Sequence, residues 1–409
     1  MNRASGSGTS AVDFFLSANE AEISSLKQLA ENCELVIIIN DLVHQLQRER
    51  GLSNIFLQTS GNRFASQRSA QLPKTDVAEQ AFRRALARLD IQSQGRAALL
   101  SQIAVALHCL DHLPILRPKV GELAVSPEDS ATEYSHTITA LLQIVFEAAD
   151  RASSPEISRA MVALFNFMQG KEYAGQERAW AALGFAAGHF PTELIERLDH
   201  LRDTQEQCFS LFSELAVSEQ RQAWVSLQES KDSRELTQLR DIFHRAGAGN
   251  ALPPQISELW YELATQRIDN MQEIETALLT HLEKLGHHQI QHAKSAMRLQ
   301  KQNIDELLDE KAHADEKGES TILAGYESNR IEPLFSLIKD QSQRLQDLNS
   351  ELVKARQSLN DRKLIERAKG LLMDTHKISE DQAYHHLRKA AMERGLPLIK
   401  IAEALLQTD

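Results

Sequence analysis

Apolar residues recur at spacings of three and four along most of the chain, which is the period of an α-helix. The clearest case is residues 361–406, where three short apolar stripes follow one another. Their members are Leu364, Ile365, Ala368, Leu371 and Leu372, then Ala383, Leu387 and Ala390, and last Leu398, Ile401, Ala402 and Leu405. Ser379 and Gln382 have the spacing of a capping box before the second stripe. Gly395 suits the end of that helix and Pro397 the start of the next. The pattern predicts a small three-helix bundle packed around alanines.

Nearer the N-terminus, an apolar helical stripe leads into a basic residue in three places. The stripes are Ile39, Leu42, Val43 and Leu46 before Arg50, Leu164 and Phe167 before Lys171 and Arg178, and Leu236 and Leu239 before Arg240. The first stripe belongs to a long helical pattern over residues 11–58. Because a guanidinium stays charged and is costly to bury alone, each arginine predicts an anionic partner. That partner is either a protein carboxylate or a bound ligand.

Two loops and one heptad pattern divide the rest of the chain. Residues 246–255 (AGAGNALPPQ) predict a loop, and the charged residues 309–325 predict a flexible connection. A heptad seam without Pro or Gly then runs into Arg362 and predicts a coiled coil, either between two chains or against the rest of the protein. Its members are Ile338, Gln341, Leu345, Leu348, Leu352, Ala355 and Leu359. Gln341 and Ala355 weaken the seam, which fits a contact that can switch.

The composition narrows the class of protein. Few glycines, prolines and aromatic residues in 409 residues favour an all-α protein of two or three domains. The thiols of Cys33, Cys109 and Cys208 match no metal or redox spacing and are expected to be buried in a reducing cytoplasm. The histidines between 281 and 292 lack a converging ligand set, so no metal is expected. With no apolar run of about eighteen residues and a polar start, the chain is expected to be soluble and cytoplasmic.

Charge is informative through its distribution. Residues 361–409 carry nine Lys and Arg against eight Asp and Glu, whereas the whole chain has a net charge of −12. A broadly basic surface for nucleic acid is therefore absent, and the candidate contacts are local. Phosphate contacts are predicted for Arg362, Lys363, Arg367, Lys369, Arg388 and Lys389, and stacking on unpaired bases for Tyr384 with His385 or His386. Each of these residues could instead belong to an ordinary solvated face.

Residues 361–406 resemble the ANTAR domain of transcription antiterminators. The resemblance rests on residues in the family's order and spacing: Arg362, Ile365, Ala368-Lys369-Gly370, Leu372-Met373, Ser379, Ala383-Tyr384, Leu387-Arg388, Ala390-Ala391-Met392 and Ile401-Ala402. ANTAR domains bind a pair of hairpins in nascent leader RNA and prevent formation of a terminator. The resemblance implies the same activity here, with duplex DNA as the alternative target of a small three-helix module.

Two short segments echo each other and point to a second family. Gln47-Arg48-Glu49-Arg50-Gly51 is echoed by Gly175-Gln176-Glu177-Arg178-Ala179, which hints at two related helical bundles. Residues 12–282 resemble the NIT domain, an all-helical nitrate and nitrite sensor. Together with the C-terminal module, the chain resembles the nitrate-responsive antiterminators of nitrate assimilation operons. In that family two bundles hold the anion between them, with one arginine from each of two separated helices.

The resemblance implies that Arg50 and Arg240 bind the anion, with Arg178 and Lys171 in reserve. A guanidinium fork can donate two parallel hydrogen bonds to a planar anion such as nitrate. The alternatives stay open: Arg50 could pair with Glu49 or another carboxylate, and Arg240 with Asp241.

These observations predict an all-α, ligand-gated RNA-binding regulator rather than an enzyme, since no catalytic motif is present. The predicted order is a tail (1–11), a sensor (12–308), a linker (309–330), a coiled-coil helix (331–360) and an RNA-binding domain (361–409). Nitrate or nitrite is expected as effector, with no cofactor. The expected partners are leader RNA, the elongation complex indirectly, and a second copy of the chain through the coiled coil or the C-terminal domain. Alternatively, the chain is a small-anion-responsive regulator that acts on duplex DNA or on a protein partner.

Overall fold

The computed structural model describes residues 11–89, 96–150, 152, 154–246, 255–316, 327–378 and 380–407. Within these ranges it contains twelve α-helices and no strand, which confirms the predicted all-α class. The predicted loop at 246–255 and the capping residue Ser379 lie largely or wholly outside these ranges.

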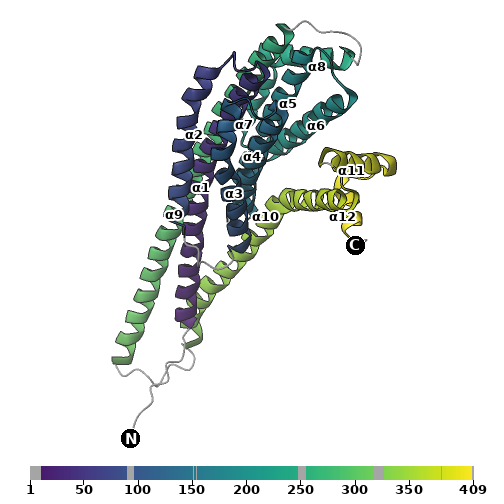
Figure 1. The fold of residues 1–409 in the computed structure, drawn as a ribbon. Helices are drawn as coiled ribbons and strands as arrows, with labels where there is room; N and C mark the ends of the chain where they lie inside the picture. Colours follow the sequence, from purple (N-terminus) through teal and green to yellow (C-terminus); the bar gives the residue numbers. More distant parts are fainter. Residues whose placement is uncertain are drawn as a thin grey trace.

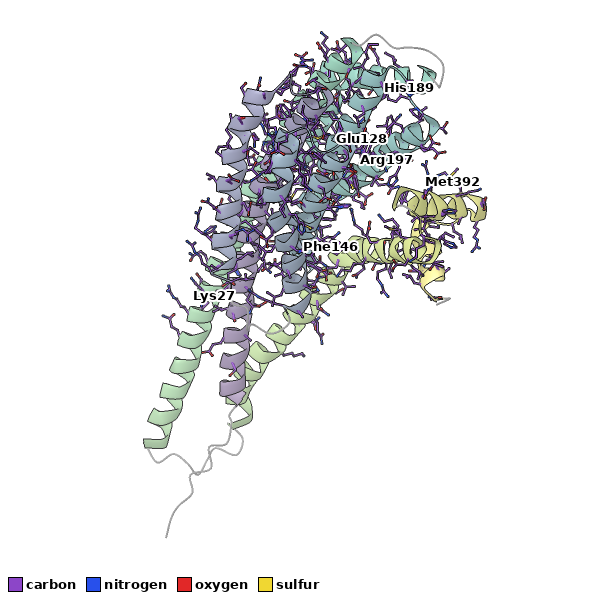
Figure 2. The ribbon with its side chains drawn as sticks, in the orientation of Figure 1. Lys27, Glu128, Phe146, His189, Arg197 and Met392 are labelled. Atoms are coloured by element: carbon purple, nitrogen blue, oxygen red, sulfur yellow. The ribbon has the colours of Figure 1, made fainter. Side chains whose placement is uncertain are left out.

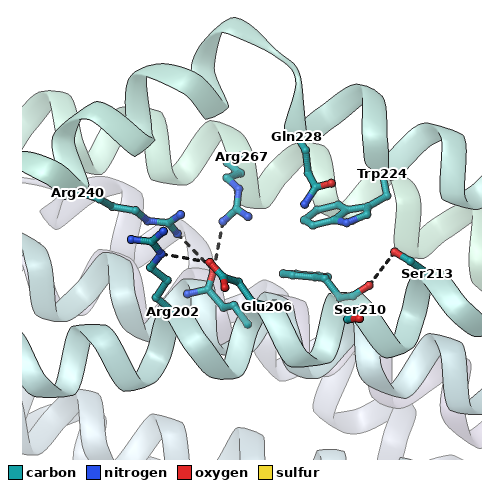
Figure 3. Close-up of a pocket in the computed structure, with 10 residues that line it drawn as sticks. Arg202, Glu206, Ser210, Ser213, Trp224, Gln228, Arg240 and Arg267 are labelled. Atoms are coloured by element: carbon teal, nitrogen blue, oxygen red, sulfur yellow. Dashed lines mark hydrogen bonds and ion pairs between the residues drawn. The ribbon is translucent and has the colours of Figure 1, made fainter.

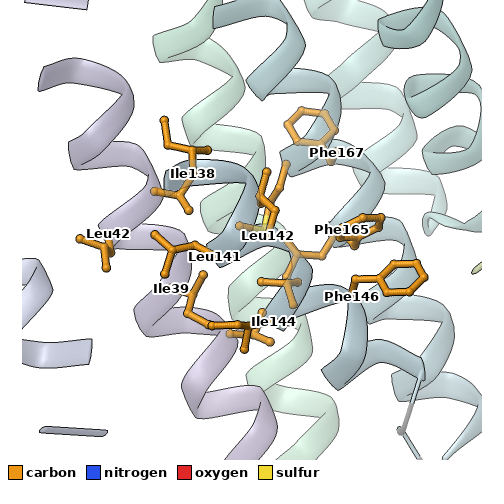
Figure 4. Packing of buried hydrophobic residues seen from close by; sticks show 14 of the residues in the cluster. Ile39, Leu42, Ile138, Leu141, Leu142, Ile144, Phe146, Phe165 and Phe167 are labelled. Atoms are coloured by element: carbon orange, nitrogen blue, oxygen red, sulfur yellow. The ribbon is translucent and has the colours of Figure 1, made fainter. Parts of the chain in front are cut away.

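A first bundle is formed by α1 (Ala11–Gln58), α2 (Ala65–Leu86), α3 (Ala97–Gly121) and α4 (Pro127–Asp150). Long apolar stripes drive its assembly: Ile39 and Leu42 of α1 are fully buried against Ile138 and Leu141 of α4 (Figure 4). Burial of each such side chain contributes about 1.5–3 kcal/mol. Among the described residues, α3 is the one helix whose length and apolar composition would suffice to span a membrane. Its buried stripe, which includes Leu110, belongs to the core of this bundle.

A second group of helices shares the core of the first. It comprises α5 (Pro155–Ala187), α6 (Thr192–Leu215), α7 (Ser218–Gln228), α8 (Lys231–Ala246) and the long α9 (Gln255–Glu316). Helix α5 is central, because it packs on α1, α4, α6, α9 and α10 (Figure 1). Most of its side chains are buried, charged ones included, so every face of this helix meets protein.

The linker expected from residue 309 begins later in the structure. Helix α9 runs past Leu308 to Glu316, because residues 309–316 contain no Gly or Pro and are mostly good helix formers. The rest of the expected linker, up to residue 326, lies outside the described ranges.

The heptad segment and the first helix of the C-terminal module form one continuous helix, α10 (Glu327–His376). It turns away from the first bundle and carries α11 (Glu380–Arg394), which lies beside α6, and α12 (Leu398–Gln407), which packs on α10 and α11 (Figure 1). Of the predicted seam, the side chain of Leu352 is described and is half-buried, while the other members lie outside the described side chains.

The C-terminal module has the predicted core. Ala368, Leu387, Ala391, Ile401 and Ala402 are buried together, with Ile365, Leu372, Ala390, Leu398 and Leu405 packed against them. Gly395 ends α11 with a φ of +60°, and the N–H of Leu396 donates to the carbonyl of Ala391 over 3.1 Å. A left-handed residue of this kind suits glycine and closes a helix C-terminus.

Candidate functional site

Arg50 lies fully inside the sensor and is held by a carboxylate. Its guanidinium forms two hydrogen bonds to the fully buried Glu172 of α5, and one terminal nitrogen donates to Ser135 Oγ over 2.8 Å. Gln47, one turn earlier on α1, also donates to Glu172 (2.9 Å). The buried guanidinium of Arg50 was expected to have an anionic partner, and in the protein that partner is Glu172 rather than Glu49.

Where α1 crosses α5, Arg50 of α1 lies against a glycine of α5 and Arg178 of α5 lies against a glycine of α1. A Cβ atom built on Gly175 would lie 2.6 Å from Arg50 Nη2, and one built on Gly51 would lie 2.7 Å from Arg178 Nη2. Each arginine thus lies over the glycine of the other echoed segment, which explains why both segments pair an arginine with a glycine. Arg178 also donates to Thr265 Oγ1 (3.0 Å) and lies 5.0 Å from the Tyr261 ring centre.

The reserve residue Lys171 belongs to another polar cluster. Its ammonium contacts Glu275 and Gln272 of α9, and Asn40 of α1 donates to Glu275 over 2.9 Å. Lys171 and Glu275 are both buried, so this pair ties α5 to α9 inside the protein.

Arg240 binds a different carboxylate of α5. Its Nε and Nη2 donate to the two oxygens of Glu177, each over 2.6 Å, in a bidentate pair. Burial alone would raise the pKa of Glu177, but the charge of Arg240 and hydrogen bonds from Arg240 and Gln205 outweigh it and hold that pKa below its usual range. Glu177 is thus ionised at neutral pH. It is Glu177, and not Asp241, that forms the ion pair with Arg240.

The structure does not bring Arg50 and Arg240 to one carboxylate. Glu172 and Glu177 are five positions apart on α5, which places them about 140° apart around the helix axis. Arg50 and Arg240 therefore approach α5 from different sides, each neutralised by its own partner.

Sequence reasoning missed most partners in these networks, among them Glu172, Glu177 and Gln205, and also Arg267, which donates to Gln205 over 3.3 Å. Glu172 and Glu177 lie in the same segments as the basic residues that the sequence analysis selected. Their presence on that helix could have indicated them as partners of the buried basic residues. Gln205 and Arg267 fall in ordinary amphipathic patterns, so no sequence signal marked them.

The predicted RNA-contacting residues divide into two sets. Four face the sensor: Arg362, Lys363, Tyr384 and Arg388. Arg367, His385 and Lys389 are exposed, while Lys369 is buried and pairs with Glu366 at 2.9 Å. His386 is exposed as well.

Contacts of the first set join the C-terminal module to α4, α5 and α6. The Arg362 guanidinium lies 5.0 Å from the Phe165 ring centre, and Lys363 Nζ lies 2.7 Å from Asp150 and 5.3 Å from the ring centre of Phe146. Phe146 is labelled in Figure 2, close to α10. These contacts occupy two of the basic residues predicted to contact RNA.

A second group of contacts holds α11 against α6. Tyr384 is buried, accepts a hydrogen bond from Gln207 Nε2 over 2.7 Å and has its ring centre 4.4 Å from that of His200. Arg388 forms an ion pair with Asp203. The tyrosine predicted to stack on a base therefore packs against a sensor histidine, with the two rings tilted by 49°.

Comparison with known proteins agrees with this two-part organisation. A family described as nitrate and nitrite sensing (NIT) matches residues 41–283, and the ANTAR family matches residues 354–406. The chain belongs to the NIT family and carries an ANTAR domain. A nitrate regulatory protein of Klebsiella oxytoca is 34% identical over 99% of this chain and 97% of its own length.

A solved structure supports the same arrangement. The NasR transcription antiterminator is 34% identical, covers 97% of this chain and 98% of its own, and superposes with a TM-score of 0.63. The transcriptional regulatory protein PdtaR of Mycobacterium tuberculosis is 34% identical over 19% of this chain and 37% of its own length. The NIT match contains Arg50, Lys171, Arg178 and Arg240, and the ANTAR match contains all eight predicted RNA-contacting residues.

Proposed function

We propose that this protein is a nitrate- or nitrite-responsive regulator that binds hairpins in leader RNA and prevents transcription termination upstream of nitrate assimilation genes. The observation that carries the proposal is the docking of the ANTAR domain on the NIT domain through the residues expected to bind RNA. Arg362, Lys363, Tyr384 and Arg388 all contact sensor side chains.

The docked arrangement corresponds to a state that binds RNA weakly. Anion binding in the sensor favours an undocked state by no more free energy than its differential affinity for the two states. The undocked ANTAR domain then frees the four residues that contact the sensor, beside the exposed Arg367, His385 and Lys389. Phosphate contacts come from the cations, and Tyr384 stacks on an unpaired base.

The anion acts on the buried arginines of the sensor. Both Arg50 and Arg240 already have carboxylate partners, so the anion has to share a guanidinium with Glu172 or Glu177 or displace that carboxylate. Either change alters the position of α5, which packs directly on α10. Arg178 and Lys171 remain the reserve ligands, since they lie on the same helix.

The remaining elements of the proposal follow from this mechanism. The protein is a regulator without catalytic activity or cofactor, and it acts in the cytoplasm. It reaches the elongation complex through the nascent RNA. Self-association through α10 or the ANTAR domain would bring two RNA-binding surfaces together for a pair of hairpins.

Binding of the full-length protein to a leader hairpin RNA, with and without nitrate, tests the proposal. We expect nitrate to strengthen hairpin binding, with a weaker response for Arg240→Gln and little binding to a DNA duplex of the same sequence at equal salt. Tight hairpin binding that ignores both nitrate and nitrite would overturn the proposed gating. Preference for the DNA duplex would overturn the RNA assignment.

A further inference from the structure

A polar pocket of 390 Å³ opens between α6, α7, α8 and α9 on the side of α5 that carries Glu177 (Figure 3). Its walls include three guanidinium groups, from Arg202, Arg240 and Arg267, and one large aromatic face, from Trp224. These side chains come from four different helices, so the pocket exists only in the assembled sensor domain.

Two of the guanidinium groups converge on one neutral oxygen. Gln205 Oε1 accepts from Arg240 Nη2 over 3.5 Å and from Arg267 Nη1 over 3.3 Å. The Gln205 amide nitrogen donates to Glu177 over 2.8 Å, so Gln205 is itself oriented by the carboxylate. Arg240 and Arg267 are thereby held next to each other despite their like charge.

The negative charge around the pocket neutralises only part of the positive charge. Glu177 is paired with Arg240, and Glu206, which is mostly exposed, is paired with Arg202 over 3.2 Å. Within the part of the chain that the structure describes, no carboxylate lies within ion-pair distance of Arg267. Three cations against two carboxylates leave the pocket with one uncompensated positive charge.

The surroundings of Arg267 confirm that its charge is poorly satisfied. Burial lowers its pKa first, and the positive charge of Arg240 lowers it further, to about 9, so the group remains protonated at neutral pH. Its guanidinium carbon lies 5.8 Å from the Trp224 ring centre, a weak attraction that does not replace a counter-ion.

We propose that a small planar oxyanion of the nitrate and nitrite class binds in this pocket between Arg240 and Arg267, against the face of Trp224. The inference rests on the proposed function, which it extends by assigning Arg267 as a further anion-binding residue. A monovalent anion matches the single uncompensated charge, and two guanidinium forks can donate to its oxygens in one plane. Arg50 lies beside Glu172 on another side of α5, so the guanidinium adjacent to Arg240 is that of Arg267.

Calorimetric titration of the full-length protein with sodium nitrate at constant ionic strength tests the assignment. Arg267→Gln should weaken nitrate binding on the order of ten- to a hundredfold, the effect of losing charged hydrogen bonds. Arg267→Lys should weaken nitrate binding less, because lysine keeps the positive charge but cannot donate the two parallel hydrogen bonds of a guanidinium. Arg83→Gln in α2 is the control for a lost arginine, since Arg83 is paired with Glu79 and Asp111 and does not line the pocket, and it should change affinity by less than about twofold.

Thermal unfolding without nitrate distinguishes ligand binding from a structural role. Removing Arg267 relieves its repulsion with Arg240, so Arg267→Gln should leave the melting temperature unchanged or raised, while the increase caused by nitrate disappears. Nitrate binding at wild-type affinity in Arg267→Gln would overturn the inference and leave the proposed function intact. A melting temperature several degrees lower without nitrate would mark Arg267 as structural and overturn it too. Absence of nitrate and nitrite binding by the wild-type protein would instead overturn the proposed effector.

Discussion

Two fully buried basic side chains of the sensor, Arg50 and Lys171, each have a carboxylate opposite them, and the two pairs join different helices. Arg50 with Glu172 connects α1 to α5, and Lys171 with Glu275 connects α5 to α9. Such pairs add little net stability compared with apolar residues of the same size, but losing one partner is costly. Their main effect is to allow one arrangement of these helices.

Glu172→Gln should lower the free energy of unfolding by about 3–5 kcal/mol, because Arg50 then stays buried without a counter-ion. The measurement is denaturant unfolding of the full-length protein. Replacing both partners, with Arg50→Met and Glu172→Leu in one chain, should recover a large part of the loss. If the single variant unfolds like the wild type, Arg50 does not depend on Glu172.

His44 makes the sensor sensitive to acid. Burial, followed by the positive charges of Lys171, Arg48 and Arg178, lowers its pKa from 6.5 to about 3. The unfolded chain therefore binds a proton below pH 6.5 that the folded chain refuses until about pH 3. Stability should be unaffected above pH 6.5 and fall between these values, by at most about 1.4 kcal/mol per pH unit for one proton.

Unfolding free energies measured from pH 7 to pH 4 test this contribution. His44→Gln should reduce the slope with pH, whereas the exposed His136→Gln serves as control and should keep it. Equal slopes for His44→Gln and the wild type would exclude His44 as the acid-sensitive group.

At the scale of elements, α5 organises the sensor because small residues let its neighbours come close. A Cβ atom on Gly170 would lie 2.6 Å from the Phe209 ring, and one on Gly175 would meet Arg50. Phe209 in turn stacks on Trp224, with ring centres 4.1 Å apart, and meets Phe167 edge-on. Glycine is required at position 170 by this close approach rather than by its backbone angle.

Gly170→Ala should destabilise the protein by about 1–3 kcal/mol, because the Phe209 ring would have to shift from its contacts with Trp224 and Phe167. Gly286→Ala in α9 is the matched control: nothing lies within 4 Å of its Cβ position. That change should stabilise by about 0.5–1 kcal/mol through helix propensity. Denaturation midpoints measure both, and a neutral Gly170→Ala would show that α6 can shift away from α5.

Much of the element structure could be predicted from the sequence, because a period of 3.6 residues and an inward stripe are local properties. The core of the ANTAR domain and the inward positions of Arg50 and Arg178 are confirmed by burial. The end of α9 was placed too early, since a run of charges does not by itself stop a helix. Whether Arg50 and Arg240 bind nitrate stays a prediction.

Which carboxylate faces which buried basic residue could not be predicted, for a physical reason. Glu172 is 122 positions from Arg50, and Arg267 is 62 positions from Gln205. These contacts depend on how the helices rotate against one another, and residue patterns within a single helix do not specify that rotation. The prediction therefore named inward-facing arginines but neither Arg267 nor the carboxylates that face the arginines.

At the scale of the whole molecule, one helix links sensing to RNA binding. Helix α10 packs on α4 and α5 of the NIT domain and continues into the ANTAR core, while α11 rests on α6. The docking contacts are mostly polar: Lys363 with Asp150, Arg388 with Asp203 and Tyr384 with Gln207. A polar, partly exposed interface is weak enough for a modest coupling free energy to open it.

Reversing one docking charge should therefore open the protein without an anion. Asp203→Arg places a cation against Arg388. We therefore expect hairpin RNA binding in the absence of nitrate to strengthen by roughly two- to tenfold. This range corresponds to the loss of one partly exposed ion pair and the addition of one repulsion. Glu206→Arg, on the same helix but paired with Arg202 instead, is the matched control for added positive charge and should strengthen binding less. Combining Asp203→Arg with Arg388→Asp restores opposite charges, and in that protein nitrate should again be needed for binding, at an affinity reduced by the loss of Arg388 itself. If Asp203→Arg and Glu206→Arg raise RNA affinity equally, the gain comes from general charge attraction, and docking through α6 does not restrain the ANTAR domain.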